Sequence, residues 1–434
     1  MTALVDEMMA FLDASVTPYH AVAEAAAVLD AAGFTALDPL GPWDGREADG
    51  PAYVARDGSL VAWVPGSERD AGAPMRLIGA HTDSPGLRIR PRPDRSVAGF
   101  RQLAVEVYGG ALRNSWLDRD LGLAGRVALR GPGGAVEHRR LRTESAVMRV
   151  PQLAIHLDRE ISSTGLNLNP QQHLTPVWGL GDSHDGEFRA WLAEQVDAPV
   201  DAVTAWEIMA FDVQPPALIG PDAELLAAGR LDDLACCWAA LGAIIAATPS
   251  SAERRTTSVV VLNDHEEVGS ATATGADGAW LEHVLERRAV ALGGTRSDLL
   301  RSLAASMLLS ADMAHATHPN YPERHEPGHW VLAGGGPVVK HNVNARYATD
   351  SRSAAAFRSA CGSVGIVAQD YSHRGDLPCG STIGPLTAAR LALDTVDVGM
   401  PMLSMHSARE LMATADVAPM LATFTAWLTA PPGT

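Results

Sequence analysis

Side chains that could bind a divalent metal ion follow short apolar runs at four places in the sequence. The runs and the polar residues after them are Met75–Ala80 with His81 and Asp83, Ser258–Leu262 with Glu266 and Glu267, Met307–Ala311 with Asp312, and Pro401–Met405 with His406. Imidazole and carboxylate groups are ligands of zinc, manganese and cobalt, and a carboxylate can bridge two ions. The residue types therefore predict a centre for divalent metal ions, although the spacing alone does not name the reaction.

The elements that must position these side chains are buried strands of one sheet. The apolar runs are short, and helical patterns such as the apolar stretch Leu231–Ala247 lie between them. This alternation is typical of a mainly parallel α/β sheet. Ligands of open α/β sheets bind beyond the carboxyl ends of the strands, so we expect the four groups to meet at one edge. Asp232, at the start of the apolar helix, adds a further carboxylate.

Charge balance favours two ions. Two divalent ions bring a charge of +4, and the carboxylates of Asp232, Glu267 and Asp312 offset three of these charges. The remaining positive charge would favour a metal-bound hydroxide near neutral pH. Glu266, beside the predicted ligand Glu267, is then the predicted general base. Neighbouring residues of an extended chain point to opposite sides, so both glutamates reach the site only if the chain turns after Asn263-Asp264.

Each of these residues also has a simpler interpretation. His81 or His406 alone could be a hydrogen-bonded loop histidine. Asp232 and the adjacent Asp233 could cap the helix that follows them. The Glu266-Glu267 pair could be a solvated turn. The repeated placement of such residues after apolar strands favours the metal site over these alternatives.

Composition excludes several classes of protein. The chain has 434 residues, 47% of them hydrophobic and 5% aromatic, and a formal net charge of −17, which disfavours nucleic acid or anionic lipid as a partner. The four cysteines form no C-x-x-C pair and are predicted to be reduced. The acidic N-terminal segment lacks the basic region of a signal peptide, and the longest apolar run, Leu234–Ala247, is too short to span a membrane. We expect a cytoplasmic protein with no membrane segment.

The middle of the chain has a different pattern of apolar and turn-forming residues. Alternating apolar residues at Leu103, Val105 and Val107, and turns at Gly109-Gly110 and 131–134, indicate a β-rich block that ends near Pro215-Pro216. We therefore predict one catalytic α/β domain in two parts, residues 1–92 and 222–434. It is interrupted by a β-rich domain of residues 93–221.

The sequence resembles the aspartyl aminopeptidase family of metallopeptidases from about residue 10 to residue 427. The stretches that carry the resemblance are GAHTDSPGLRIRP, GRLDDLACC, NDHEEVGS, SADMAHATHPNYPERHEP, GPVVKHNVNARYATD, DLPCGSTIGP and MHSARE, in the order of the family. Several of these motifs are long and unusual.

The resemblance implies a two-zinc aminopeptidase, with manganese or cobalt as alternative metals. The matching positions make Asp232 the bridging ligand, give His81 and Asp312 to one ion, and give Glu267 and His406 to the other. Glu266 would be the base that activates a bridging water and passes its proton to the leaving amine. Asp83 would orient His81. One metal would hold the free α-amino group of a small peptide, so only its first residue would be removed.

The resemblance also implies a substrate preference and an assembly. Lys340 and Tyr347 match positions near the substrate side-chain pocket, where a cation suits an N-terminal Asp or Glu. The family's middle domain forms dimers that assemble into a dodecamer, and His156 matches a histidine that reaches the active site of the neighbouring subunit. Without the resemblance, Lys340 would be interpreted as a surface lysine and His156 as a core or interface histidine.

Two departures from the family pattern do not remove a predicted ligand. Asp233 stands where the family usually has Asn, and His265 precedes the glutamate pair where another polar residue is common. Three other functions share much of the pattern: an aminopeptidase that prefers neutral residues, a metal-dependent deacylase of N-acyl amino acids, and an inactive shell or scaffold protein. The intact base at Glu266 argues against the last of these.

Overall fold

The computed structural model describes residues 2–251 and 253–431, which form two compact units. Among the described residues, unit 1 consists of 2–83, 217–251, 253–405 and 410–431, and unit 2 of 84–216 and 406–409. The predicted domain boundaries at 92/93 and 221/222 stay predictions.

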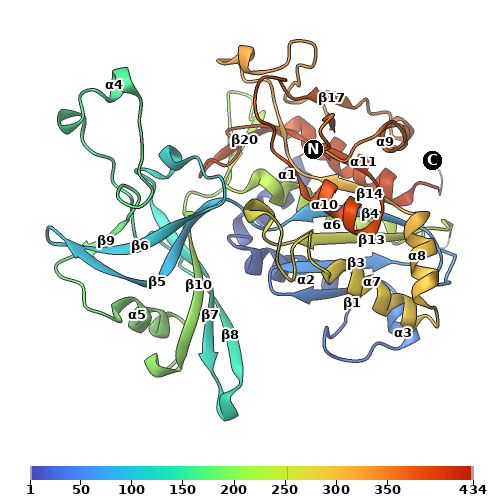
Figure 1. Cartoon of the computed structure of the whole chain (residues 1–434), viewed down its shortest axis with the longest axis horizontal. Coiled ribbons are helices and arrows are strands. Elements are labelled where there is room, and N and C mark those ends of the chain that lie inside the picture. Colours follow the sequence, from blue (N-terminus) through green and yellow to red (C-terminus); the bar gives the residue numbers. More distant parts are fainter. Residues whose placement is uncertain (1, 252, 432–434) are drawn as a thin grey trace. The chain divides into compact units, whose positions relative to one another are not determined.

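Unit 1 is built on a large mixed sheet (Figure 1). Its nine strands in the described part of the chain, in spatial order, are β1 (Thr35–Ala36), β2 (Ala52–Arg56), β3 (Ser59–Val64), β13 (Thr257–Asn263), β4 (Met75–His81), β14 (Met307–Ala311), β18 (Asp394–Gly399), β16 (Val338–His341) and β17 (Gln369–Ser372). The four central strands β13, β4, β14 and β18 are mutually parallel, so their carboxyl ends lie at the same edge. The predicted fold class, α/β with a mainly parallel sheet, is confirmed.

Helices cover both faces of this sheet (Figure 1). One face packs on α1 (Thr2–Ala14), α2 (Pro18–Ala31), α6 (Leu231–Ala247), α9 (Ser351–Ser363) and α11 (Val417–Thr429). The other face packs on α7 (Trp280–Ala291), α8 (Arg296–Ala304) and the end of α10 (Ile383–Leu391), while the short α3 (Gly45–Ala48) contacts α7. Side chains of β4 alternate between the two cores, Leu77 on one face and Ile78 on the other, as the two-residue period of a strand requires.

One predicted strand belongs to a different sheet. We expected Pro401–Met405 to end at the same edge as the other three runs, and this prediction is wrong. β19 (Pro401–Leu403) lies in a small second sheet of unit 1, and β18 occupies the place in the main sheet. The described strands of the small sheet, in spatial order, are β11 (Ala217–Ile219), β12 (Leu225–Ala228), β20 (Glu410–Ala413), β19 and β15 (Ala314–His315).

Unit 2 is β-rich. Its sheet, in spatial order over the described residues, consists of β8 (Val136–Arg142), β7 (Leu121–Arg130), β10 (Val203–Asp212), β5 (Gly86–Val97), β6 (Phe100–Tyr108) and β9 (Val177–Leu180). The described part of the unit also contains two α-helices, α4 (Ile161–Thr164) and α5 (Glu187–Gln195). Phe188 and Leu192 of α5 are fully buried in the apolar core that α5 shares with the sheet.

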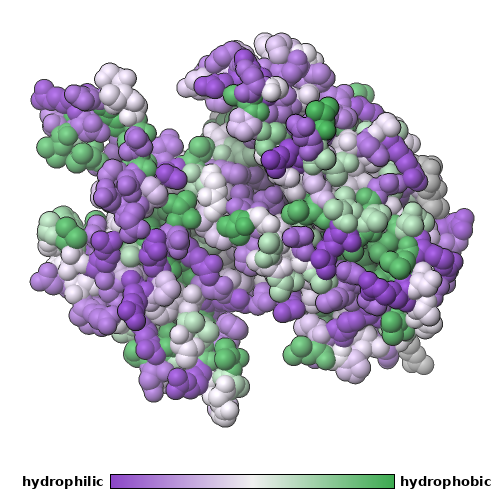
Figure 2. All heavy atoms as spheres, in the orientation of Figure 1, coloured by the Kyte–Doolittle hydropathy of each residue, from purple (hydrophilic) through white to green (hydrophobic). Residues whose placement is uncertain are grey.

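The described helices contain no segment that is both long enough and apolar enough to cross a membrane. Polar side chains cover much of the face drawn in Figure 2, with apolar patches scattered among them.

Candidate metal centre

His81 is the last residue of β4 and lies at the carboxyl edge of the main sheet. Its side chain is buried, with Nδ1 3.0 Å from the carbonyl oxygen of Asp83 and 3.5 Å from the carboxylate of that residue. The other ring nitrogen, Nε2, is 3.4 Å from Oδ1 of Asp232. The imidazole is thus held between two carboxylates that come from different elements.

Asp232 and Asp233 lie at the start of α6, where the backbone has not yet become helical. Both side chains are buried, and the peptide bond between them is cis. The backbone N–H of Asp232 donates to Oε2 of Glu410 at 3.1 Å, and Oδ2 of Asp233 accepts from the backbone N–H of His81 at 3.1 Å. His81, Asp232 and Asp233 each offer one ligand atom to a group whose atoms all lie within 4.8 Å of one another.

The chain turns at Glu266 and Glu267, as a site that uses both glutamates requires. His265 has φ 66°, and a single 3₁₀ turn follows at Glu266–Val268. Asp83 holds this turn: its Oδ1 accepts from the backbone N–H of Glu266 at 3.0 Å and its Oδ2 from that of Glu267 at 3.1 Å. Both glutamates share a second group with His81 in which the ligand atoms lie within 4.8 Å of one another.

The electrostatics of these groups favour a bound cation. Burial and the nearby carboxylates raise the pKa of Glu266 to about 8, against the opposing effect of His81. Burial likewise raises the pKa of Asp233, again with His81 opposing. Burial acts to lower the pKa of His81, but its carboxylate neighbours outweigh this and raise it. Carboxylates packed this closely cannot all ionise without a positive charge among them, so the donor set fits a divalent metal ion.

One buried atom supports the same fit. Among the described residues, Oδ1 of Asp233 has no hydrogen-bond partner, although the residue is fully buried. A buried carboxylate oxygen without a donor is costly, and a metal ion or a proton would satisfy it.

Asp312 follows β14 and pairs with a lysine. Lys340 of β16 is buried, and its Nζ donates to Oδ1 of Asp312 at 2.9 Å. Burial acts to lower the pKa of Lys340, but the charge and hydrogen bond of Asp312 outweigh it and raise it. Burial also raises the pKa of Asp312, although Lys340 acts to lower it. The interpretation of Lys340 as a surface lysine is therefore wrong.

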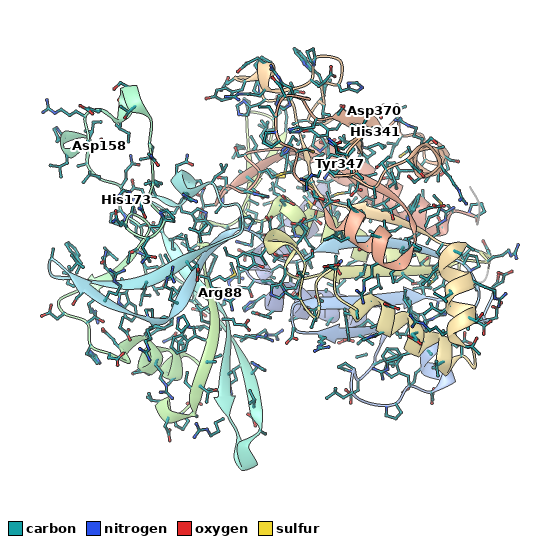
Figure 3. The ribbon with its side chains drawn as sticks, in the orientation of Figure 1. Arg88, Asp158, His173, His341, Tyr347 and Asp370 are labelled. Carbon is teal, nitrogen blue, oxygen red and sulfur yellow. The ribbon has the colours of Figure 1, made fainter. Side chains whose placement is uncertain are left out.

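Tyr347 belongs to the same group as Lys340. It is buried, and its ring centroid lies 5.5 Å from Nζ of Lys340. Cys379 packs against the apolar cluster that contains Tyr347. Figure 3 shows where Tyr347 lies in unit 1, with His341 and Asp370 nearby.

Two predicted site residues belong to unit 2. His406 follows β19 by three residues, and its Nδ1 lies 3.2 Å from the carbonyl oxygen of Gly110. His156 is exposed in the turn Ile155–Leu157. The roles predicted for both residues stay predictions.

Sequence reasoning did not find two buried residues close to these groups. Glu410 accepts the amide of Asp232, as described above. Asp397 is fully buried in β18, where it accepts from the Thr382 hydroxyl and from the backbone N–H of Ala348. A charged residue inside the apolar run of β18 was the one signal in the sequence that could have identified Asp397.

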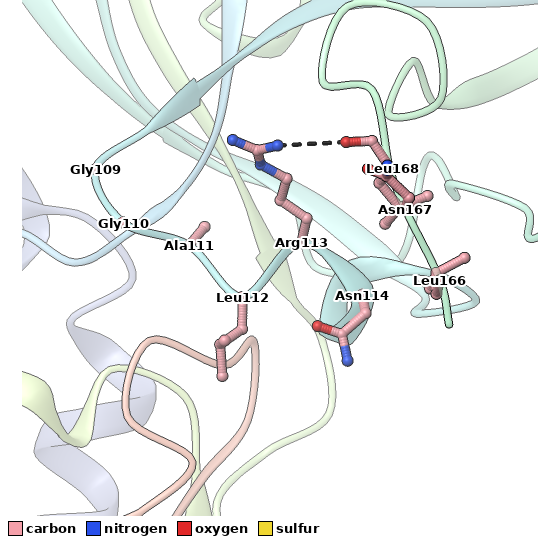
Figure 4. Close-up of a pocket in the computed structure, with 9 residues that line it drawn as sticks. All are labelled: Gly109, Gly110, Ala111, Leu112, Arg113, Asn114, Leu166, Asn167 and Leu168. Atoms are coloured by element: carbon pink, nitrogen blue, oxygen red, sulfur yellow. Dashed lines mark hydrogen bonds between the residues drawn. The ribbon is translucent and has the colours of Figure 1, made fainter. Parts of the chain in front are cut away.

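Unit 2 contains a cavity of about 690 Å³ with different chemistry (Figure 4). It is lined by residues 109–114 and 166–168, and Arg113 is the one ionisable side chain in this described lining. Arg113 donates to the carbonyl oxygen of Leu168 at 3.3 Å (Figure 4). This cavity therefore lacks the carboxylates that distinguish the candidate metal centre of unit 1.

Comparisons with known proteins give one consistent result. The family model described as aminopeptidase I zinc metalloprotease (M18) matches residues 11–428. A probable M18 family aminopeptidase 2 of Streptomyces coelicolor is 49% identical over 412 residues, which cover 95% of this chain and 94% of the relative.

Solved structures agree with the family match. The chain matches the cryo-EM structure of the Ape4 and Nbr1 complex with a TM-score of 0.94 and 32% identity, covering 99% of this chain and 86% of the other. It matches the structure of the S. cerevisiae mApe1 dodecamer with a TM-score of 0.83 and 29% identity, covering 97% and 95%. The chain therefore belongs to the M18 family of zinc metallo-aminopeptidases.

Proposed function

We propose that this aminopeptidase removes N-terminal Asp or Glu from peptides and uses two divalent metal ions, zinc in the first place. The observation that carries the proposal is the buried ion pair between Lys340 and Asp312, one strand away from the carboxylates around His81. It puts a cation that suits an acidic side chain beside a donor set that suits metal ions.

The proposed ligands are those of the sequence prediction. His81, Asp232, Asp312, Glu267 and His406 would hold the two ions. When bound, the ions would supply Lewis acidity toward the scissile carbonyl group. Asp233 supports the arrangement by accepting the amide of His81, which fixes the end of β4.

Glu266 is the proposed general base. Its backbone N–H is held by Asp83, and the chain turn directs its carboxylate to the same group of atoms as His81. A glutamate in this place can take a proton from the attacking water and deliver it to the leaving amine. Asp83 positions this base, because one carboxylate fixes the amides of both glutamates.

Lys340 is the proposed recognition group for the acidic side chain. It is the single lysine of the 434-residue chain, which uses arginine at every other basic position apart from histidines. An ammonium group has three donors, and Asp312 occupies one of them, so two remain for a substrate carboxylate. The Tyr347 ring beside Nζ adds an aromatic face to this pocket.

We also propose that the chain assembles as dimers within a dodecamer, in the cytoplasm. The mApe1 relative in that assembly matches nearly the full length of this chain. In unit 2, Leu153, Ile155 and Leu157 flank His156 with half or more of their side-chain surface exposed. An exposed apolar segment of this kind suits burial against a second copy, from which His156 would act. Sedimentation that shows only monomer would contradict this assembly.

The function is tested by comparing four peptides that differ in one feature: N-terminal Asp, Glu, Leu and N-acetyl-Asp. We expect free Asp and Glu to be released, Leu to be released more slowly, and the acetylated peptide to stay intact. Preferred release of Leu would overturn the acidic preference and keep the aminopeptidase. Cleavage of the acetyl group alone would favour a deacylase of N-acyl amino acids.

A further inference from the structure

A second cavity in unit 1 lies at the carboxyl ends of β16 and β17, which are parallel neighbours at the edge of the main sheet. The loops that leave the two strands enclose a volume of about 430 Å³. Its described lining consists of His341, Asn342, Val343, Asn344, Arg346, Ser372, His373, Arg374, Gly375, Leu377, Pro378 and Cys379. Crevices beyond the carboxyl ends of parallel strands are the usual ligand sites of α/β sheets.

The charge of this lining is opposite to that of the protein. The lining residues include two arginines and two histidines but no carboxylate, although the whole chain has a net charge of −17. Two of the four basic groups have acidic partners outside the lining. His341 lies 2.8 Å from Oδ1 of Asp370, as Figure 3 helps to locate, and Arg374 is paired with Asp376 at 2.6 Å. Their charges are largely balanced.

Arg346 is different. Among the described residues, no carboxylate pairs with its guanidinium group. Its backbone is nevertheless fixed, because Asn342 Oδ1 accepts from the amide of Asn344 at 2.9 Å and the Ser381 hydroxyl donates to the carbonyl oxygen of Arg346 at 3.0 Å. The backbone of the loop at Arg346 is therefore held in place, and the exposed guanidinium group carries a charge that no described carboxylate balances. Asn342, Asn344 and Ser372 add neutral polar groups around it.

Cys379 connects this cavity to the proposed specificity pocket. It lies in the cavity wall and packs against the apolar cluster that contains Tyr347, whose ring centroid lies 5.5 Å from Nζ of Lys340. A peptide whose first side chain reaches Lys340 would therefore have the cavity close to its later residues. This step rests on the proposed function, whereas the charge of the cavity does not.

We propose that this cavity binds an anionic group, a carboxylate or a phosphate, with Arg346 as its main charged contact. Two sources can supply such a group: an acidic residue or the C-terminal carboxylate of the substrate beyond its first residue, or a free small anion. Arginine suits both, because its planar group binds carboxylate and phosphate oxygens in pairs.

The kinetic test compares Asp-Ala-Ala with its C-terminal amide, and Asp-Glu-Ala-amide with Asp-Gln-Ala-amide. We expect the wild type to have a lower KM for the more acidic member of at least one pair. Arg346→Gln should remove about three- to tenfold of that KM advantage and leave kcat for the amides unchanged. Arg301→Gln, which removes an exposed arginine of α8, is the matched control and should keep the wild-type preference.

The second test needs no peptidase activity. Cys379 is the partly exposed cysteine, whereas Cys236, Cys237 and Cys361 are buried. Iodoacetate is anionic and iodoacetamide is neutral, so their relative rates of reaction with Cys379 report on an anion site. We expect Arg346→Gln to lower the ratio of iodoacetate to iodoacetamide labelling about threefold or more. Inorganic phosphate should slow labelling of the wild type but not of this variant.

The outcomes are distinct. A lost KM advantage in Arg346→Gln identifies the substrate as the source of the anion, and phosphate protection without a KM advantage identifies a free anion. Equal KM values together with an unchanged labelling ratio would overturn the proposal. If Cys379 reacts with neither reagent, the kinetic test decides. If the protein releases no N-terminal residue at all, the proposed function fails while the labelling test still decides the anion site.

Discussion

The carboxyl edge of the main sheet in unit 1 and the sheet of unit 2 treat charged residues in opposite ways. In unit 1, His81, Asp232, Asp233 and Asp312 lie buried at one edge of the main sheet, with a single lysine to balance them. In unit 2, Glu207 pairs with Arg88 and Arg126 while each side chain keeps part of its surface in solvent. Solvated pairs cost little and stabilise little, whereas buried like charges are costly. The difference teaches that the buried charges of unit 1 serve chemistry and not stability.

The largest effect is expected when the proposed general base, Glu266, is replaced. Glu266→Gln keeps the shape of the side chain and the hydrogen bonds of its backbone, but it cannot accept a proton. We expect kcat to fall about 10²- to 10⁴-fold, with the metal content unchanged. Glu286→Gln, in an exposed pair with Arg296, is the control and should be fully active. Wild-type turnover by Glu266→Gln would remove this residue from the mechanism.

The next change tests Asp83, which holds the backbone of Glu266 in place. The two carboxylate oxygens of Asp83 accept one hydrogen bond each from the backbone N–H groups of Glu266 and Glu267. Asp83→Asn keeps only one of these two acceptor oxygens. We expect metal affinity or kcat/KM to fall about 10- to 100-fold, because groups that orient ligands have effects of this size. A calorimetric metal titration and peptide kinetics would measure both. An unchanged variant would mean that the turn is held by other contacts.

The third prediction compares two substrates and concerns Lys340. Lys340→Ala removes the cation beside Asp312, so kcat/KM for peptides with N-terminal Asp should fall about 30-fold or more. Peptides with N-terminal Leu should lose far less. Lys340→Arg keeps the charge and is expected to recover part of the loss. Equal losses for both peptides in Lys340→Ala would remove this residue from the specificity pocket.

The smallest expected effect lies in unit 2. Glu207→Gln breaks a pair that is about a third exposed, with Arg88 at 2.9 Å. We expect the free energy of unfolding to change by less than about 1 kcal/mol, and peptide hydrolysis to be unaffected. Denaturant unfolding monitored by fluorescence would measure the change. A loss several times larger would show that charges in unit 2 are not merely surface pairs, and the contrast with unit 1 would fail.

Three strands of the main sheet, and the places of some candidate site residues after them, could be predicted from the sequence because they depend on local patterns. β14 has the predicted bounds Met307–Ala311, and β4 and β13 extend the predicted runs by one residue or two. Their carboxyl ends locate His81 and Asp312 because parallel strands share a direction. The turn at Glu266 was also suggested by the residues before it.

The features that could not be predicted depend on contacts between residues far apart in the sequence. β18 was missed because Asp394 and Asp397 interrupt its apolar pattern, and the buried Asp397 accepts hydrogen bonds from Thr382 and Ala348, which are 15 and 49 residues away in the sequence. β19 was therefore assigned to the wrong sheet. The burial of Lys340 could not be inferred either, since its partner Asp312 lies 28 residues away. Such pairs form only in the tertiary structure. The hydrophobic periodicity and the composition of the sequence do not reveal them.

The most direct test of the central claim is a metal titration of the chelated protein, with zinc content and release of Asp from an Asp-peptide measured on the same samples. Removal of metal should abolish activity, and zinc should restore it with two ions bound per chain. In Asp232→Asn, the proposed bridge, zinc should restore far less. Full activity after verified removal of the metal, or full recovery in Asp232→Asn, would contradict the account of a two-metal centre around His81 and Asp232.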